Sequence, residues 1–128
     1  MHNILMYICV ILTNNSMYST ELIKGTLKTI VLKQLEQNKR MYGYEITQRV
    51  KELTANRIQI TEGALYPTLH ALEAEGLVVT ESEYIGKRLR KYYSLSNSGQ
   101  KKIEEKLNEL AEFMETLRFL LDLKPQTL

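Results

Sequence analysis

The chain has 128 residues, of which 44% are apolar and 25% are charged, and its formal net charge is +2. This composition fits one globular domain and excludes both a disordered chain and two full domains. A single cysteine, Cys9, excludes an intramolecular disulfide, and with only two histidines it does not supply the usual ligand set of a zinc site. The apolar run at residues 4–12 is too short for a bilayer, which needs about 20 residues.

Residues 1–16 are interpreted as an N-terminal extension whose order the pattern does not fix. Their apolar run lacks the basic flank and the small-residue cleavage site of a signal peptide. Met17 is the more natural beginning of the folded part. A cytoplasmic protein without a metal or a cofactor is the default expectation.

Charge is distributed unevenly along the chain. Residues 62–85 hold five acidic and no basic side chains, whereas residues 86–102 hold six basic and no acidic ones. A local basic cluster can bind a polyanion even where the total charge is close to zero. The segment 86–102 is therefore a candidate for contact with a nucleic acid.

Two amphipathic helices are predicted first in chain order. Residues 19–38 have apolar side chains at helical spacing, with Ser19 or Thr20 available as the N-cap. Residues 42–56 repeat the pattern, and the short β-branched run at 57–60 then predicts a strand. The apolar positions of the two helices are Leu27, Ile30, Val31, Leu35, Ile46, Val50 and Leu53.

A third helix is predicted within residues 60–78, where three leucines recur on one helical stripe. Gly63 and Pro67 lie in its first turns, although glycine costs about 1 kcal/mol in a helix interior and proline about 3 kcal/mol. An ordinary packing helix would rarely contain both, so we expect the N-terminus of this helix to be approached by another molecule. The leucines of the stripe are Leu65, Leu69 and Leu72.

Two strand-like runs follow at residues 77–83 and 90–96, and Gly86 between them indicates a hairpin. A long helix over residues 97–122 comes last, with Ser96 or Asn97 as its N-cap. The complete order is helix, helix, short strand, helix, hairpin and long helix.

This order is typical of a winged helix-turn-helix, a DNA-binding arrangement. We therefore expect a mainly α fold with a small β-hairpin, followed by a long C-terminal dimerisation helix. The expected domains are a winged helix-turn-helix DNA-binding domain at residues 17–96 and a dimerisation helix with its tail at residues 97–128.

In a winged helix-turn-helix the third helix enters the major groove of DNA. Thr61 is expected to cap this helix, and Gly63 would let the backbone come close to a phosphate. Pro67 has no backbone N–H, so it would leave the carbonyl of Gly63 without its usual partner. The contact residues predicted on this helix are Thr61, Glu62, Gly63, Ala64, Tyr66, Pro67 and His70.

Several of these side chains also have a purely structural explanation. Tyr66 could be a partly buried aromatic residue, although its place opposite the leucines favours a hydroxyl contact to phosphate. His70 is as well explained as a surface histidine, and Glu62 as a charge that offsets the helix dipole. Of the two tyrosines at the start of the second helix, Tyr42 is predicted to reach DNA, whereas Tyr44 is predicted to pack inward.

The hairpin carries four cations within five positions, and no carboxylate lies near them in the sequence. An ordinary solvated hairpin would explain the pattern, but such a cluster repels itself. Contact with phosphates would remove that repulsion and would give binding a steep salt dependence. The predicted phosphate contacts are Lys87, Arg88, Arg90 and Lys91.

The last helix has apolar residues separated alternately by four and three positions, which is a heptad seam. Such a stripe could pack wholly on its own domain, but two further apolar side chains make the surface wider than one seam needs. The excess favours a second copy of the chain as partner, which would also set the spacing of two recognition helices. The predicted dimerisation residues are Ile103, Leu107, Leu110, Phe113, Met114, Leu117, Leu120 and Leu121.

Three segments resemble the signature regions of PadR-type transcriptional regulators: "MYGYEI" at 41–46, "EGALYPTLHALEAEGLV" at 62–78 and "GKRLRKYYSLSNSG" at 86–99. The resemblance covers roughly residues 20 to 122. It implies a dimeric, usually repressing, cytoplasmic DNA-binding protein, in some members released by a small molecule. The single short C-terminal helix resembles the smaller subtype. Some drug-binding relatives hold their ligands with a tryptophan, which this chain lacks.

Other functions find less support in the sequence. There is no Ser/His/Asp set with a nucleophile elbow, no phosphate-binding glycine loop and no carboxylate pair in an apolar run, so an enzyme is not expected. A winged helix that binds protein instead of DNA is the main rival, and a steep salt dependence of duplex binding would separate the two. A small-molecule sensor is a third reading, with Phe113, Met114 and Leu117 lining the pocket, although a dimer core explains these residues equally well.

Overall fold

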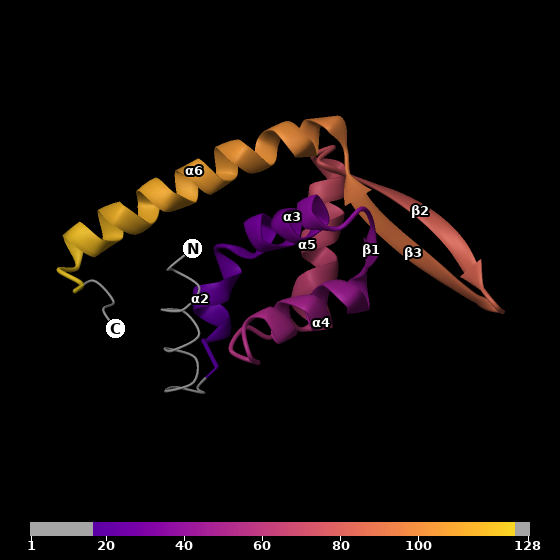
Figure 1. Cartoon of the computed structure of the whole chain (residues 1–128), viewed down its shortest axis with the longest axis horizontal. Coiled ribbons are helices and arrows are strands. Elements are labelled where there is room, and N and C mark those ends of the chain that lie inside the picture. Colours follow the sequence, from indigo (N-terminus) through magenta and orange to yellow (C-terminus); the bar gives the residue numbers. More distant parts are fainter. Residues whose placement is uncertain (1–16, 125–128) are drawn as a thin grey trace.

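The computed structural model describes residues 17–124, so the interpretation of residues 1–16 lies outside it. The fold is mainly helical with a small β-hairpin, as the sequence predicts, and a short additional strand makes a three-stranded antiparallel sheet (Figure 1). Within the described residues, no helix is long and apolar enough to cross a membrane. The elements are α2 (Thr20–Lys24), α3 (Leu27–Gln37), β1 (Met41–Tyr42), α4 (Gly43–Leu53), α5 (Glu62–Ala74), β2 (Val78–Ile85), β3 (Arg88–Leu95) and α6 (Asn97–Leu120).

The first predicted helix is interrupted. Residues 19–38 do not form one helix, because α2 ends at Lys24, with Gly25 as its C-cap, and α3 begins after Thr26. The Thr26 hydroxyl and backbone N–H both donate to the carbonyl of Ile23, at 3.0 Å each, which closes a turn. The prediction of a continuous helix is wrong, because the spacing of apolar residues carries no information about this local hydrogen bond. Ser19 caps α2 by accepting from the N–H of Leu22, as one of the two expected N-caps.

The segment 57–60 is not a strand, contrary to the prediction. The N–H of Ile58 donates to the hydroxyl of Thr54 at 3.0 Å, and Ile60 packs into the core, so this segment is a loop. Its β-branched side chains bury apolar surface, but its backbone does not pair with a strand. The strand that joins the hairpin in the sheet is instead β1. It pairs with β3, with Met41 opposite Tyr93.

The hairpin of β2 and β3 forms the wing. The two strands are paired over eight positions, from Val78 opposite Leu95 to Ile85 opposite Arg88. The connecting turn has only two residues, and Gly86 adopts a φ of +65° in it. A left-handed backbone conformation at the first turn position matches the right-handed twist of the flanking strands. Glycine adopts this conformation without strain. The sequence correctly places the turn at this glycine.

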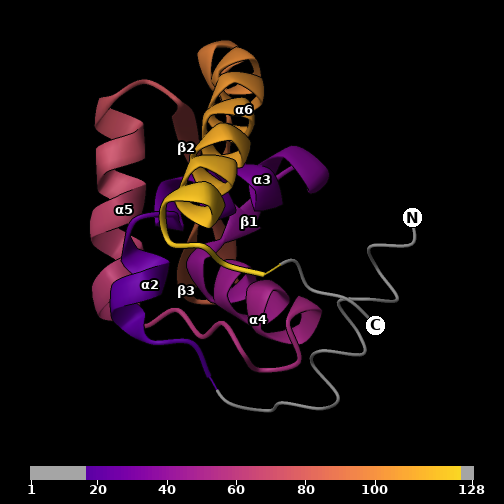
Figure 2. The same cartoon turned by 90° about the vertical axis from the view of Figure 1, so that its left-hand side faces the viewer.

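Helices α4 and α5 cross steeply in both views, as the two helices of a helix-turn-helix do (Figures 1 and 2). The core lies between α3, α4, α5 and the base of the sheet. Its most deeply buried side chains are Val31, Leu32, Ile46, Leu65, Leu69, Leu72, Val78, Tyr93 and Ile103.

One predicted dimerisation residue belongs to this core. Ile103 in α6 is 0% exposed, and Leu107 packs partly against the same cluster. The prediction that Ile103 forms the first position of the dimer seam is therefore wrong. The first turns of α6 complete the core of the chain itself, and the helix then runs along α3 and continues past it (Figure 1).

Candidate nucleic-acid interface

The first turn of α5 is built as the sequence predicts. Thr61 is the N-cap, and its hydroxyl accepts from the N–H of Ala64 at 3.2 Å. Pro67 lies inside the helix without interrupting it, so the carbonyl of Gly63 has no N–H donor four residues on. The N-terminus of α5 is thus ordered but still presents polar backbone groups to the surface.

The two faces of α5 separate as expected. Its three leucines are buried, and the seven contact residues predicted on this helix are all exposed. Exposure is necessary for a contact with DNA, and the contacts themselves stay a prediction. The exposed residues are Thr61, Glu62, Gly63, Ala64, Tyr66, Pro67 and His70.

A groove of about 620 Å³ separates the wing from the beginnings of α4 and α5. The N-termini of both helices border it, and each carries partial positive charge from its free N–H groups. Across the groove, β3 contributes a basic edge. The lining residues are Tyr42, Gly43, Tyr44, Glu62, Tyr66, Arg88, Leu89, Arg90, Lys91 and Tyr93.

Tyr66 crosses from α5 to the start of α4. A Cβ placed on Gly43 would lie 2.7 Å from the hydroxyl oxygen of Tyr66, so the ring rests directly on this glycine. The glycine of the YGY sequence, Gly43, is therefore explained by packing, because a larger residue would collide with Tyr66. The tyrosine hydroxyl is brought to the mouth of the groove, where the side chain remains partly exposed.

The assignment of the two tyrosines needs a correction. Tyr44 does not pack inward, because it is 60% exposed and lines the groove. Tyr42 is partly buried, with its ring edge-on to Tyr92 at 5.7 Å and beneath the guanidinium of Arg90 at 4.0 Å. Tyr44 is thus a site candidate that the sequence reasoning missed. Its position at the second residue of the α4 N-terminus was the signal that could have found it.

The four cations of the wing are not equivalent. Lys91 lies 3.8 Å from the carboxylate of Glu73, and Arg90 stacks on Tyr42. A hydrogen bond to Tyr92 is the main cause that raises the pKa of Arg90 above its ordinary value. The expectation that no carboxylate lies near these four cations is wrong. In the folded chain Glu73 of α5 lies beside Lys91.

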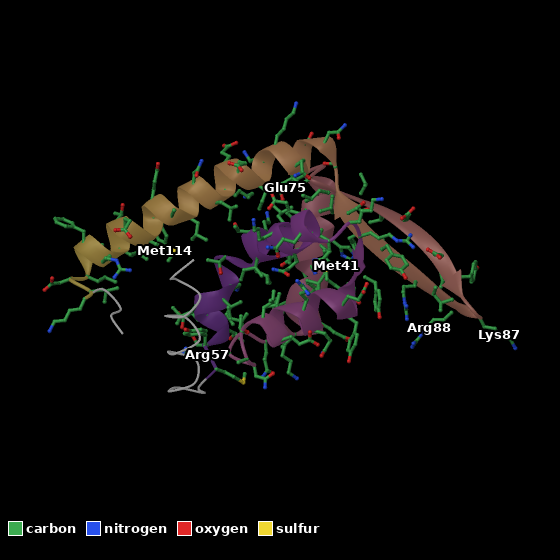
Figure 3. The ribbon with its side chains drawn as sticks, in the orientation of Figure 1. Met41, Arg57, Glu75, Lys87, Arg88 and Met114 are labelled. Atoms are coloured by element: carbon green, nitrogen blue, oxygen red, sulfur yellow. The ribbon has the colours of Figure 1, made fainter. Side chains whose placement is uncertain are left out.

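Lys87 and Arg88 lie at the tip of the wing, where both side chains extend into solvent (Figure 3). Neither side chain takes part in an ion pair with any residue of the described range 17–124. An exposed cation pair without carboxylates is free to neutralise phosphates. These two residues are the strongest phosphate candidates of the wing.

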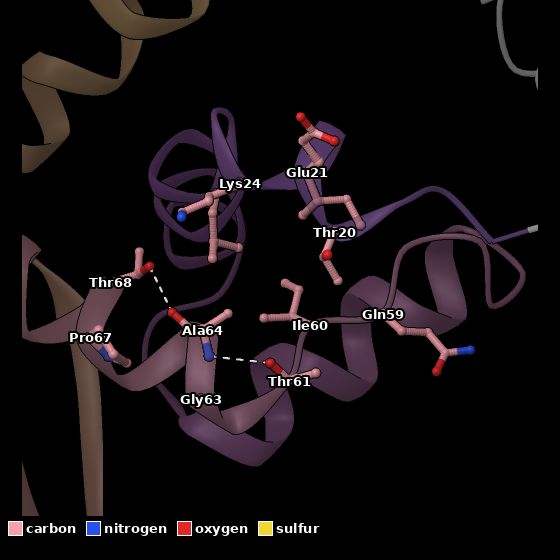
Figure 4. Close-up of a pocket in the computed structure, with 12 residues that line it drawn as sticks. Thr20, Glu21, Lys24, Gln59, Ile60, Thr61, Gly63, Ala64, Pro67 and Thr68 are labelled. Carbon is pink, nitrogen blue, oxygen red and sulfur yellow. Dashed lines mark hydrogen bonds between the residues drawn. The ribbon is translucent and has the colours of Figure 1, made fainter.

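A second cavity, of about 690 Å³, lies behind α5 (Figure 4). Side chains of Ile23, Leu27 and Ile60 form its apolar part, and Pro67 and Thr68 of α5 form one wall. Within this wall the hydroxyl of Thr68 donates to the carbonyl of Ala64 at 2.9 Å. The cavity and the wing groove share no lining residue, so they border different sides of the first turns of α5.

The outer half of α6 leaves its apolar side chains largely uncovered. Leu110 and Leu117 are half-buried, whereas Met114 is 53% and Leu121 58% exposed. Phe113 and Leu120 are exposed beside them. Phe119 is 88% exposed and lies on the opposite side of the helix, where the heptad analysis did not find it.

Comparison with known proteins identifies the family. The model of the transcriptional regulator PadR-like family matches residues 31–105. Uncharacterized protein X of Lysinibacillus sphaericus is 31% identical over 83% of this chain and 97% of its own length. A transcriptional regulator of Mycobacterium tuberculosis is 36% identical over 56% of this chain and 64% of its own length.

Solved structures agree with the family match. A PadR family transcriptional regulator from Eggerthella lenta superposes with a TM-score of 0.70 at 30% identity, over 81% of this chain and 88% of that one. A transcriptional regulator from Clostridium thermocellum also gives 0.70, at 25% identity, over 83% of this chain and 100% of that one. These neighbours are regulators and not enzymes. The chain belongs to the PadR-like family of DNA-binding transcriptional regulators.

Proposed function

We propose that this chain is a cytoplasmic repressor that binds a dyad-symmetric operator as a homodimer. The observation that carries the proposal is the groove in which two helix N-termini and the basic edge of β3 meet. Helix N-termini and exposed cations both favour phosphate oxygens, so one stretch of DNA backbone satisfies all three elements at once. The exposed face of α5 would then lie in the adjacent major groove.

The homodimer rests on the surface of α6. Several large apolar side chains are exposed along its outer half, and such a patch on a monomer indicates an interaction site. A second copy covers the same patch symmetrically and places a second α5 at a fixed distance. We infer a repressing role because a dimer bound across a promoter would block transcription.

Replacing both Lys87 and Arg88 with alanine is expected to weaken binding to every duplex, specific or not. Each lost phosphate contact should reduce the magnitude of the log-affinity versus log-salt slope by about 0.9, or roughly 2 per protomer for the pair. Preference among sequences should survive, because these residues read no bases. Fluorescence anisotropy titrations at several salt concentrations would measure both quantities.

The control is Lys102→Ala with Lys106→Ala, which removes the same charge from α6. This control should change the slope by less than half as much. An unchanged affinity of the Lys87 and Arg88 variant at low salt would contradict the interface, and would favour a winged helix that binds protein. The operator itself can be found by sequencing genomic fragments that the purified chain retains.

Gly43→Ala is expected to weaken DNA binding without unfolding the protein. The added Cβ would displace the end of the Tyr66 side chain, which can swing aside, and a lost hydroxyl contact to phosphate costs roughly 1.5–3 kcal/mol. Affinity should therefore fall about tenfold or more. Urea unfolding would check that stability is kept. In a Tyr66→Leu background the same replacement should have no further effect, and a further loss there would show that Tyr66 is not the cause.

Release by a small molecule has support from the cavity behind α5. Its volume of about 690 Å³ is comparable to that of many ligand pockets, which span roughly 300–1,000 Å³. A ligand there would contact α2 and the first turns of α5 together and could shift the latter. Thr20→Trp should obstruct part of the cavity, so a compound that lowers operator affinity of the parent should have a weaker effect on this variant. An equal response of both proteins would place the effector elsewhere.

A further inference from the structure

One carboxylate of α5 contacts both strands of the wing. Glu73, near the C-terminal end of α5, accepts a hydrogen bond of 3.2 Å from the hydroxyl of Thr80 in β2. Its other oxygen lies 3.8 Å from the ammonium of Lys91 in β3. Because Thr80 is opposite Tyr93 and Ser82 is opposite Lys91 in the register, these contacts lie on the face of the hairpin that packs on the core. Glu73 thus connects both strands of the wing to the recognition helix.

The other face of the wing is held by Arg40, which precedes β1. Its guanidinium donates to Glu81 at 2.7 Å and to Glu83 at 2.6 Å, and lies 4.1 Å from the ring centre of Tyr92. Residues 84–89 make no side-chain hydrogen bond or ion pair within the described part of the chain. The tip of the wing therefore projects beyond two points of attachment, one on each face.

The distance from the attachment to the tip amplifies any error in angle. Arg88 is three residues beyond Lys91, which in a strand is about 10 Å. A rotation of a few degrees at Glu73 would shift the tip by a fraction of an ångström. Loss of the Glu73 contacts would leave side-chain attachment by Arg40 on the other face only. The proposed contacts of Lys87 and Arg88 with phosphates would depend on this placement.

Lys91 differs from the tip cations in its surroundings. It has the Glu73 carboxylate on one side and the Tyr93 ring at 5.5 Å. Burial, followed by the nearby Glu73 and Tyr66, raises the pKa of Tyr93 above its ordinary value, so the Glu73 charge acts on the base of the groove. A cation at this position offsets an internal carboxylate, whereas Lys87 and Arg88 have none to offset.

We propose that Glu73 is a positioning residue for DNA binding, which fixes the wing relative to α5 through Thr80 and Lys91. Lys91 serves this attachment and is not a phosphate contact. The inference rests on the proposed function, because the angle of the wing affects activity only if its tip contacts DNA.

The position of the wing can be measured without DNA. Nitroxide labels at Glu52→Cys in α4 and Ile85→Cys at the wing tip, in a Cys9→Ser background diluted with unlabelled protein, give the distance by double electron–electron resonance. We expect a narrow distribution for the parent and a distinctly broader one for Glu73→Gln. The matched control is Glu75→Gln, which removes a carboxylate that pairs with Lys28 at 2.9 Å and does not touch the wing. A distribution that stays narrow in Glu73→Gln would overturn the proposal.

Charge exchange tests the same attachment from the other side. Glu73→Lys combined with Lys91→Glu restores an ion pair between α5 and β3, and should restore the narrow distribution that either single variant loses. It should also recover most of the DNA affinity. Failure of the exchange to recover either quantity, with each single variant folded by circular dichroism, would contradict the assignment of the pair.

Salt dependence separates this inference from the proposed function. Lys91→Gln should lower operator affinity about threefold to fivefold, the size expected from a partly exposed ion pair, with an unchanged salt slope. Arg88→Gln should reduce the slope by about 0.9 per protomer. An unchanged slope in Arg88→Gln would contradict the proposed wing contact, whatever Glu73 does. A reduced salt slope in Lys91→Gln would show that Lys91 contacts phosphate, and would overturn the proposal that it serves only the attachment of the wing.

Discussion

A double variant with Met114→Glu and Leu121→Glu is expected to be a folded monomer that has lost most of its operator affinity. Both side chains are more than half exposed in the single chain, so their replacement leaves the core intact. In a dimer they would be covered, where each buried apolar side chain contributes about 1.5–3 kcal/mol and an unpaired carboxylate costs considerably more. Light scattering would report the mass, and anisotropy titration would report the affinity.

The two kinds of DNA binding should respond differently in this variant. Specific affinity depends on two half-sites held by one dimer, so it should fall by several orders of magnitude, whereas non-specific affinity per protomer should change little. Asn108→Glu with Thr116→Glu adds the same charge to the opposite side of α6 and should leave the dimer intact. A monomer that binds the full operator as tightly as the parent would refute the dimer mechanism.

Gly99→Ala is expected to destabilise the fold and to misplace α6. Gly99 is buried in the first turn of this helix, and an added Cβ would overlap the backbone carbonyl oxygen of Leu77. The same carbonyl accepts from the N–H of Ser96 at 3.1 Å, so neither partner can move freely. Because the obstruction is backbone, we expect a loss of roughly 1–3 kcal/mol in unfolding free energy.

This replacement should affect regulation as well as stability. A shift of α6 at its origin changes the spacing of the two recognition helices, so operator affinity should fall further than the fraction of folded protein predicts. Urea unfolding and operator titration of the same preparation would test this. Gly25→Ala is the control, since no atom lies within 4 Å of its added Cβ and stability should hardly change. Equal stabilities of the two variants would contradict the packing argument.

The sequence by itself determined the features that follow from helical period and from single capping or turn residues. It did not predict the break between α2 and α3, although the bonds from Thr26 to Ile23 that form it are local. Helical period assigned the buried and exposed faces of α5 correctly, because each residue adds a fixed rotation. The N-cap at Thr61 and the hairpin turn at Gly86 were also predicted, since a hydroxyl or a glycine at one position is sufficient to form them. The three signature segments then indicated the family.

Only the tertiary structure decided which distant residues meet. Besides β2, the strand that pairs with β3 is β1, whereas the β-branched segment 57–60 pairs with no strand. The path of α3 and α4 brings β1 to β3, and β-propensity alone does not decide this. Ile103 shares the spacing of the seam residues but is buried in its own domain, since α6 starts against the core and later leaves it. Periodicity reports that a side chain is apolar on a given face, and does not report what covers that face.

The charges show the same division. Four cations in the wing looked alike in sequence, but Lys91 lies near Glu73 of α5 and Arg90 stacks on the ring of Tyr42. Lys87 and Arg88 make neither an ion pair nor a ring contact with residues 17–124. Arg40 reaches Glu81 and Glu83 across 41 and 43 positions of the chain. Electrostatic energy depends on separation in space, which the fold sets, so the sequence supplied the basic cluster and the tertiary structure decided which of its members remain available to DNA.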